Sequence, residues 1–343
     1  MRKLNTVLIA GMVAGFGAMA ALPALADYKE EYKISTVVPA PFPWGIVAED
    51  WAKLVGERTD GRINMKVYPG AQLVSGDQTK EFTAMRRGVI DMAVGSTINW
   101  SPQIKEMNVF SMPFLMPDHK SIDALTQGPV GEKLFEIISE KGVQPLAWSE
   151  NGFRELSNSK HPVRTPADLA GLKIRVVGSP LFNDTFTALG ANPTQMSWAD
   201  AKPALSTGAV DGQENPLAVF DIARIHEVGQ SNLTLWHYVA DPLVIAVNQD
   251  VWDSFTPEDQ EIVRQAAIEA GAGGIEMSRK GLGIDGDDRA QIDKVESNGV
   301  TVVELTEAER QAFVDATRDV YAKWKTEIGA DLVDQAEKSI ADR

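Results

Sequence analysis

The feature that most constrains the fold is a pattern that occurs twice along the chain, each time after an alternation of strands and helices. Gly88-Val89-Ile90-Asp91 and Gly208-Ala209-Val210-Asp211 both follow a stretch in which apolar residues have helical spacing. We interpret each glycine as a left-handed helix stop and each aspartate as an acid that caps a local turn. The repetition predicts two halves of similar architecture.

The chain before the first occurrence alternates between strand and helix patterns. β-Branched and alternating residues predict strands over 32–38, 63–68 and 89–94, and helical spacing predicts helices over 46–57 and 77–87. Strands that alternate with helices in this order pair in parallel, with helices packed on the sheet.

The second half repeats this order. The predicted elements are a strand over 172–177, a helix over 180–189, a turn at Gly190-Ala191-Asn192-Pro193 and a helix that ends at Gly208. Ser197 and Asp200 resemble a capping box at the start of that last helix. The fold class is therefore α/β.

Further elements follow the second half. They are a strand over 243–248, a helix that begins at Thr256-Pro257, a strand over 300–305 and helices introduced by a capping box at Thr306 and Glu309. Gly271, Gly273 and Gly274 indicate a bend or an end in the first of these helices. No spacer rich in Pro, Ser or charge separates the halves, so we expect two lobes joined by several crossings, with a ligand cleft between them.

The first 26 residues have the pattern of a secretory signal peptide. Arg2 and Lys3 precede an apolar stretch over 7–22, and Ala24-Leu25-Ala26 forms a small-residue cleavage site. A transmembrane anchor is the weaker alternative, because a span needs about 20 apolar residues. The chain has no cysteine for lipidation, so we expect a mature protein that is free in the periplasm.

Composition excludes several classes of function. The formal charge of −15 argues against nucleic-acid binding, which depends on clustered Lys and Arg. The absence of cysteine excludes disulfides, thiolate nucleophiles and cysteine-bound metal centres. The four histidines lack metal-site spacing, and we expect no cofactor and no metal. A periplasmic lyase or hydrolase with Glu150 or Asp200 as general base is the alternative from another class.

Isolated basic and amide residues inside apolar segments carry the binding hypothesis. Arg175 lies in Leu172-Lys173-Ile174-Arg175-Val176-Val177, at the carboxyl end of a predicted parallel strand. A guanidinium buried there requires an anionic partner, and ligands of open α/β sheets bind at that edge. A structural ion pair is the alternative role for Arg175. Arg154 lies where the chain enters the second lobe, and Asn215 is expected to follow a strand and precede a helix.

A family resemblance rests on these same segments. Gly171-Leu172-Lys173-Ile174-Arg175-Val176, the run from Leu189 to Trp198 and Asp211-Gly212-Gln213-Glu214-Asn215-Pro216 closely resemble the solute-binding proteins of tripartite ATP-independent periplasmic (TRAP) transporters, the DctP family. The resemblance covers essentially the whole mature chain. It implies a two-lobed periplasmic binding protein fold with a cleft between the lobes and a long connecting helix. It also implies a non-catalytic, monomeric protein that closes over an organic acid and presents it to the membrane permease subunits.

The resemblance also implies roles for individual residues. Arg175 is expected to form the principal bidentate salt bridge to the ligand carboxylate, Arg154 a second cationic contact, Asn215 an amide contact and Trp198 an aromatic wall. The other candidate binding residues are Trp44, Ser96, Asn99, Gln78, Glu150 and His237.

The first lobe narrows the expected ligand. Val37, Ser96 and Asn99 stand where sialic-acid binders carry polar or charged groups, and Trp44 and Trp100 offer aromatic surface. This favours a small, rather apolar monocarboxylate, with an aromatic acid included, over a polyhydroxylated sugar acid. Glu150 keeps a zwitterionic compatible solute as an alternative, and the two arginines keep a C4-dicarboxylate. We place the first lobe at 27–150 plus about 241–280 and the second at 151–240 plus about 281–343.

Overall fold

The computed structural model describes residues 28–343, so the predicted signal peptide lies outside the described residues. Its centre is a ten-stranded mixed sheet with the strand order β2-β1-β3-β9-β4-β7-β5-β6, to which β8 adds by pairing with β4 and β10 by pairing with β8. The strands are β1 (Tyr32–Ser35), β2 (Met65–Tyr68), β3 (Met92–Ser96), β4 (Val143–Asn158), β5 (Lys173–Val176), β6 (Asn192–Gln195), β7 (Gly212–Pro216), β8 (Asn232–Leu235), β9 (Ala240–Asn248) and β10 (Thr301–Glu304).

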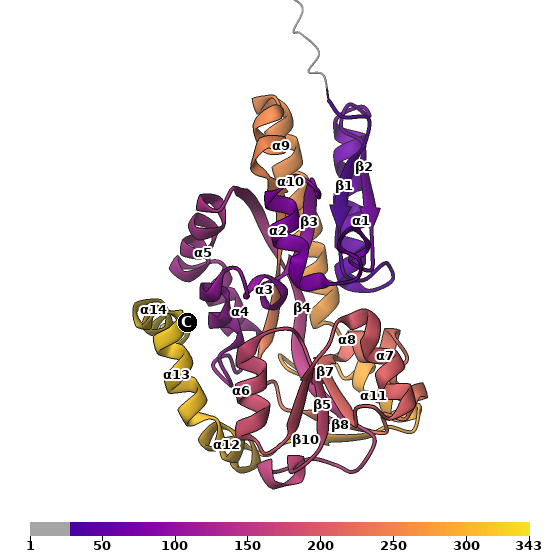
Figure 1. Ribbon diagram of the computed structural model, residues 1–343, viewed down its shortest axis with the longest axis vertical. Coiled ribbons are helices and arrows are strands. Elements are labelled where there is room, and N and C mark those ends of the chain that lie inside the picture. Colours follow the sequence, from indigo (N-terminus) through magenta and orange to yellow (C-terminus); the bar gives the residue numbers. More distant parts are fainter. Residues whose placement is uncertain (1–27) are drawn as a thin grey trace, which may run out of the picture.

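Helices cover this sheet (Figure 1). The α-helices are α1 (Pro43–Arg58), α2 (Glu81–Arg86), α3 (Thr97–Trp100), α4 (His119–Thr126), α5 (Pro129–Glu140), α6 (Pro180–Ala188), α7 (Trp198–Thr207), α8 (Leu217–Ile222), α9 (Gln249–Ser254), α10 (Pro257–Arg279), α11 (Ala290–Ser297), α12 (Glu307–Ala316), α13 (Arg318–Ile328) and α14 (Ala330–Ala341). Short 3₁₀ turns are η1 (Gln72–Val74), η2 (Gln78–Lys80), η3 (Lys105–Ser111), η4 (Pro166–Leu169) and η5 (Ile225–Val228). In residues 28–343 no helix is both long and apolar enough to cross a bilayer.

The predicted repeat is present and defines two lobes. β1 pairs in parallel with β2 and β3, and β5 pairs in parallel with β6 and β7. We name the part built around β1, β2 and β3 the first lobe and the part built around β5, β6 and β7 the second lobe; they form the upper and lower parts of Figure 1. This confirms the two-lobed α/β fold.

The glycines of the repeated pattern have the predicted role, whereas the predicted local turn role of the aspartates is wrong, because each accepts from a strand that is distant in the sequence. Gly88 and Gly208 adopt φ angles of 70° and 72°, the left-handed region in which glycine is favoured. The Asp91 carboxylate accepts a hydrogen bond from the Lys33 backbone N–H at 2.9 Å, and Asp211 accepts one from the Lys173 backbone N–H at the same distance. Each acid therefore fixes the start of the neighbouring parallel strand.

Two antiparallel strands connect the lobes. β9 pairs with β3 on one side and with β4 on the other. β4 pairs with β9 as far as Phe153 and with β7 from Arg154 onward, so a single 16-residue strand passes from one lobe into the other. The sequence pattern did not predict β4 as a strand, because it lacks polar alternation and its residues are buried on both faces.

α10 is the long helix of the fold, and an end of the helix at its glycines, one of the two predicted outcomes, is wrong. The helix continues through Gly271, Gly273 and Gly274 to Arg279. A Cβ atom at Gly271 would lie 2.4 Å from the Trp148 carbonyl oxygen, and one at Gly274 would lie 2.3 Å from a Val47 methyl group. These glycines allow α10 to pack closely on β4 and α1 without ending the helix.

Three smaller predictions had different outcomes. The predicted turn over 190–193 is wrong in its second part, because Asn192 and Pro193 begin β6, an edge strand in which a proline is tolerated. Ser197 donates its hydroxyl hydrogen to Asp200 at 2.6 Å, so the predicted capping box there is wrong. The capping box of Thr306 and Glu309 is confirmed.

Of the C-terminal helices, α12 packs on the second lobe, where Phe313 joins the hydrophobic cluster of Ile174 and Val176, whereas α13 and α14 contribute to a cluster of the first lobe. Trp324 of α13 and Ile340 of α14 belong to the same hydrophobic cluster as Phe82 and Trp100 of the first lobe. The helices lie along the side of the molecule in Figure 1. The lobe boundaries given above stay a prediction.

Candidate functional site

A cleft between the lobes holds most of the predicted binding residues. It encloses about 350 Å³ of space, counted with its opening. Its lining is Val37, Val38, Trp44, Gln78, Ser96, Asn99, Asn151, Arg154, Arg175, Val177, Trp198, Asn215, Val219 and Asp241. Of the ten candidate binding residues, eight line it and Glu150 and His237 do not.

Arg175 is a buried cation without an acidic partner. It lies in β5, and its side chain is 1% exposed. Its Nε and Nη2 donate to the Met196 carbonyl oxygen at 3.1 and 2.8 Å, and its guanidinium lies 5.9 Å from the Trp198 ring. Within residues 28–343 no Asp or Glu forms an ion pair with it, and burial lowers its pKa to about 10. The positive charge is therefore available to a bound anion.

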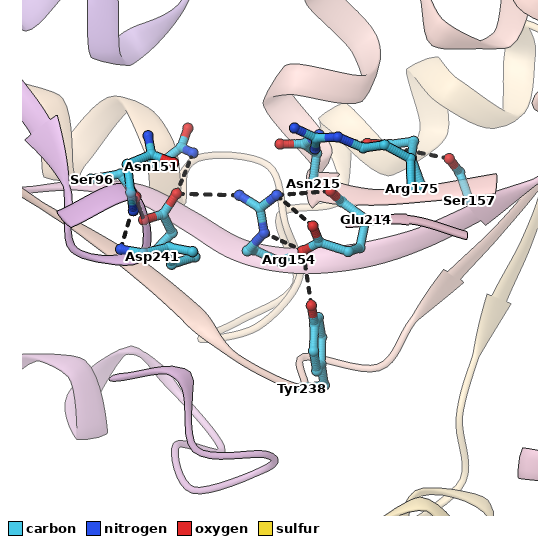
Figure 2. A network of polar contacts seen from close by, with 12 residues as sticks. Ser96, Asn151, Arg154, Ser157, Arg175, Glu214, Asn215, Tyr238 and Asp241 are labelled. Carbon is cyan, nitrogen blue, oxygen red and sulfur yellow. Dashed lines mark hydrogen bonds and ion pairs between the residues drawn. The ribbon is translucent and has the colours of Figure 1, made fainter. Parts of the chain in front are cut away.

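Arg154, by contrast, is already paired with two buried acids. Its Nε and Nη2 donate to the Glu214 carboxylate, Nη2 also donates to the Glu214 carbonyl oxygen at 2.8 Å, and Nη1 donates to Asp241 Oδ2 at 3.2 Å. Tyr238 donates its hydroxyl hydrogen to Glu214 at 2.9 Å. Burial opposes the charge of Arg154, but the two carboxylates outweigh burial and raise the pKa of Arg154. Figure 2 shows this row of groups.

Asp241 is a cleft residue that the sequence analysis missed. Its carboxylate accepts from Ser96 Oγ at 2.5 Å, from Asn151 Nδ2 at 2.8 Å and from Arg154 Nη1 at 3.2 Å. Asp241 is 1% exposed, and burial raises its pKa although Arg154 acts in the opposite direction. The one signal in the sequence is an acid that only a proline separates from the apolar strand 243–248. Asn151, Val38, Val177 and Val219 were missed as well.

Gln78 joins the two lobes across the cleft. It lies in η2 of the first lobe, and its Nε2 donates to Asn99 Oδ1 at 2.8 Å. Its Oε1 accepts from the backbone N–H of Trp198, the first residue of α7 in the second lobe, also at 2.8 Å. The lobes are therefore in direct contact at this edge of the cleft.

Asn215 lines the cleft from within β7, so the expectation that it follows the strand is wrong. Its Nδ2 donates to Gln213 Oε1 at 2.5 Å, and Gln213 Nε2 donates to Ser157 Oγ at 3.0 Å. This chain of hydrogen bonds fixes the orientation of the Asn215 amide beside Arg175 (Figure 2).

The walls of the cleft are mainly apolar. Trp44 is buried and donates its indole N–H to the Val94 carbonyl oxygen at 2.7 Å, which fixes its ring at the cleft. Val37 and Val38 extend this surface on the first lobe, and Val177 extends it on the second. Trp100 does not line the cleft, contrary to expectation, because its ring packs on Phe82 inside the first lobe.

Glu150 faces another part of the molecule. It pairs with Arg279 at the end of α10, at 2.6 Å, and Arg279 also binds Asp123. Glu150 and Arg154 lie four positions apart and would share a face of a regular strand, but a β-bulge lies between Glu150 and Gly152. The bulge brings Asn151 to the cleft in place of Glu150, so the acid that lines the cleft is Asp241 and not Glu150.

The remaining candidates also lie outside the cleft. The His237 Nδ1 lies 2.5 Å from Glu155 Oε1, and His237 lines a separate cavity with Phe153, Pro216 and Leu282. Asp200 is exposed and accepts from Ser197 at the mouth between the lobes. Neither Glu150 nor Asp200 therefore lines the cleft as a general base would.

Comparison with known proteins identifies a matching family and several relatives of this chain. The family model "Bacterial extracellular solute-binding protein, family 7" matches residues 34–327. The chain is 34% identical to the 2,3-diketo-L-gulonate-binding periplasmic protein of Escherichia coli K12, over 96% of this chain and 98% of the relative. It is 31% identical to the C4-dicarboxylate-binding periplasmic protein of Vibrio cholerae, over 86% of each.

A solved structure shows the same fold. The TRAP periplasmic solute-binding protein of Ralstonia eutropha H16, with bound (S)-2-acetolactate, superposes with a TM-score of 0.90 at 59% identity, over 92% of this chain and 100% of that one. These relatives are periplasmic binding proteins, which confirms the predicted location. The chain belongs to family 7 of the bacterial extracellular solute-binding proteins, the extracytoplasmic binding proteins of TRAP transporters.

Proposed function

We propose that this protein binds a small, branched monocarboxylate that carries hydroxyl or keto oxygens, the chemical class of 2-acetolactate, and delivers it to a TRAP permease as a monomer and without catalysis. The observation that carries the proposal is Arg175, a buried cation that lines the cleft and has no acidic partner among the described residues. The 59% identity to a protein solved with 2-acetolactate supports the ligand class.

The chemistry of the cleft fits such a ligand. A planar guanidinium matches both oxygens of a carboxylate, and each charge-assisted hydrogen bond contributes about 1.5–3 kcal/mol. The oriented Asn215 amide adds a polar contact beside Arg175. Val37, Val177 and Trp44 offer apolar surface for methyl groups.

The contact between the lobes links ligand binding to closure of the protein. The Gln78 bridge to Trp198 forms only when η2 and α7 approach each other across the cleft. β4 and β9 pass between the lobes and are the natural hinge. A closed protein with ligand therefore presents a different surface to the permease from an open one.

The test is calorimetry of purified mature protein with 2-acetolactate. We expect Arg175→Ala to weaken binding by about 100-fold or more, since two charge-assisted hydrogen bonds are lost. Arg86→Ala, which removes an exposed arginine of α2, serves as the matched control and keeps wild-type affinity. Unchanged affinity in Arg175→Ala would contradict the proposal. Equal rates of ligand loss with and without the protein distinguish binding from turnover, because a β-keto acid such as 2-acetolactate also decarboxylates on its own.

A further inference from the structure

We propose that Asp241 sets the ligand specificity of this cleft: it accepts a hydrogen bond from a hydroxyl group of the ligand and rejects a second carboxylate. The inference rests on the proposed function, because it assumes that Arg175 holds the first carboxylate. It concerns the opposite end of the cleft, where Asp241, Asn151 and Ser96 meet.

The two ends of the cleft differ in charge. In Figure 2 Arg175 and Asn215 lie to one side of Arg154, and Asp241 with Ser96 and Asn151 lies to the other. Arg175 has no acidic partner among the described residues, so a carboxylate gains a full ion pair there. A carboxylate at the other end meets the carboxylate of Asp241 instead.

Arg154 does not compensate for this repulsion. Its guanidinium is shared between Glu214 and Asp241, so these three groups carry an excess of negative charge. Together with Arg175, the two arginines and two acids are neutral before the ligand arrives. A monocarboxylate adds one negative charge to this set, and a dicarboxylate adds two in a buried site where charges interact strongly.

The hydrogen-bonding capacity of Asp241 favours a ligand donor. An ionised carboxylate has about four acceptor positions, and Ser96, Asn151 and Arg154 occupy three of them. The remaining position can accept a hydroxyl hydrogen but has nothing to offer a second carboxylate, which is an acceptor only. Arg154 Nη1 donates one of its two N–H groups to Asp241, so the other can donate to a neutral oxygen of the ligand.

The first experiment uses the wild-type mature protein and three five-carbon acids. 2-Hydroxyisovalerate has the hydroxyl group, isovalerate lacks it, and methylsuccinate carries a second carboxylate. We expect isovalerate to bind about tenfold more weakly than 2-hydroxyisovalerate and methylsuccinate about 100-fold more weakly. Equal affinity for 2-hydroxyisovalerate and methylsuccinate would overturn the role of Asp241 and leave the proposed function standing. Binding of methylsuccinate alone would contradict both.

The second experiment compares Asp241→Asn with Asp200→Asn, which removes an exposed acid at the mouth of the cleft. The carboxamide retains the shape of Asp241 and adds an N–H donor, so we expect the preference for 2-hydroxyisovalerate over methylsuccinate to fall about tenfold or more. Asp200→Asn should leave this preference unchanged. An unchanged preference in Asp241→Asn would overturn the inference.

Ser96→Ala gives an independent test if Asp241→Asn does not fold. This variant retains the Asp241 charge and frees the acceptor position that Ser96 occupied. We expect rejection of methylsuccinate to persist or increase. Loss of that rejection in Ser96→Ala would show that the serine, and not Asp241, is responsible. Loss of all binding in Arg175→Ala tests the proposed function separately.

Discussion

The central strands of the two lobes pair in the same register, but the side chains at the equivalent positions differ in charge. Ser35 of β1 pairs with Ala93 of β3, and Arg175 of β5 pairs with Gln213 of β7 in the equivalent position. In the first lobe, Ser35 donates a hydrogen bond to Glu81 at the start of α2. Glu81 precedes Gly88 by as many positions as Ala201 of α7 precedes Gly208. Ala201 is therefore the equivalent residue of the second lobe. One lobe thus has a buried acid without a cation, and the other has a buried cation without an acid.

This difference separates the scaffold from the site. The features that build each lobe, such as the aspartates that accept from Lys33 and Lys173, are the same in both. The cationic end of the cleft comes from the second lobe, whereas the first lobe supplies Val37, Trp44 and the Gln78 contact. We infer that the second lobe holds the carboxylate and that the first lobe closes over it.

The largest expected effect is on the free energy of unfolding. It is measured in two separate variants, in which Arg154 or Arg175 is replaced by methionine. Arg154→Met leaves Glu214 and Asp241 buried without their cation, so we expect a loss of about 3–5 kcal/mol in the free energy of unfolding. Arg175→Met removes a buried charge that has no acid partner, and we expect a change within about 1 kcal/mol. Denaturant unfolding measures both. Equal losses would mean that Arg175 is as structural as Arg154.

The next effect is a pH dependence that belongs to the first lobe alone. Burial raises the pKa of Glu81 to about 7, with the Ser35 hydrogen bond acting in the opposite direction, and Glu81 Oε2 has no partner among the described residues. The folded protein therefore holds this proton more tightly than the unfolded chain. Its stability must fall as the pH rises from the ordinary glutamate value of 4.5 through about 7.

The comparison of wild type with Glu81→Gln isolates this group. We expect wild type to lose on the order of 3 kcal/mol more than the variant between pH 4.5 and pH 8. Unfolding free energies at several pH values measure the difference. Parallel pH profiles would show that the Glu81 carboxylate is better solvated than its burial implies.

The smallest effect tests the contact between the lobes. A Cβ atom at Gly178 in the second lobe would lie 2.7 Å from the Thr79 methyl group in the first lobe. We expect Gly178→Ala to weaken ligand affinity about tenfold, since overpacking costs at least about 1 kcal/mol and acts only when the lobes meet. Adding Thr79→Ser removes the methyl group but retains the hydroxyl that binds Asp77. The double variant should regain affinity; no recovery would place the clash elsewhere.

Local patterns were sufficient to predict much of the scaffold. The left-handed glycines 88 and 208 and the Thr306–Glu309 capping box depend on neighbouring residues, so the sequence shows them directly. Arg175 was predicted as a binding residue because a charge inside an apolar strand requires an anionic partner, whatever the position of the strand in the sheet.

The wrong or missing predictions concern residues whose roles depend on contacts with distant parts of the sequence. Gly271 and Gly274 look like helix breakers until Trp148 and Val47 are packed against them. Glu150 was misplaced because a bulge in β4 shifts the faces of the strand. Asp241 gains its role from Arg154, which is distant in sequence and adjacent only after β9 pairs with β4.

The central claim is that the ligand carboxylate is held by Arg175 in the second lobe. A crystal structure of the mature protein grown with 2-acetolactate tests it most directly. The account predicts both carboxylate oxygens within hydrogen-bonding distance of the Arg175 guanidinium, with the ligand hydroxyl toward Asp241. A carboxylate bound to Arg154 or to the first lobe, with Arg175 contacting only Met196, would contradict it.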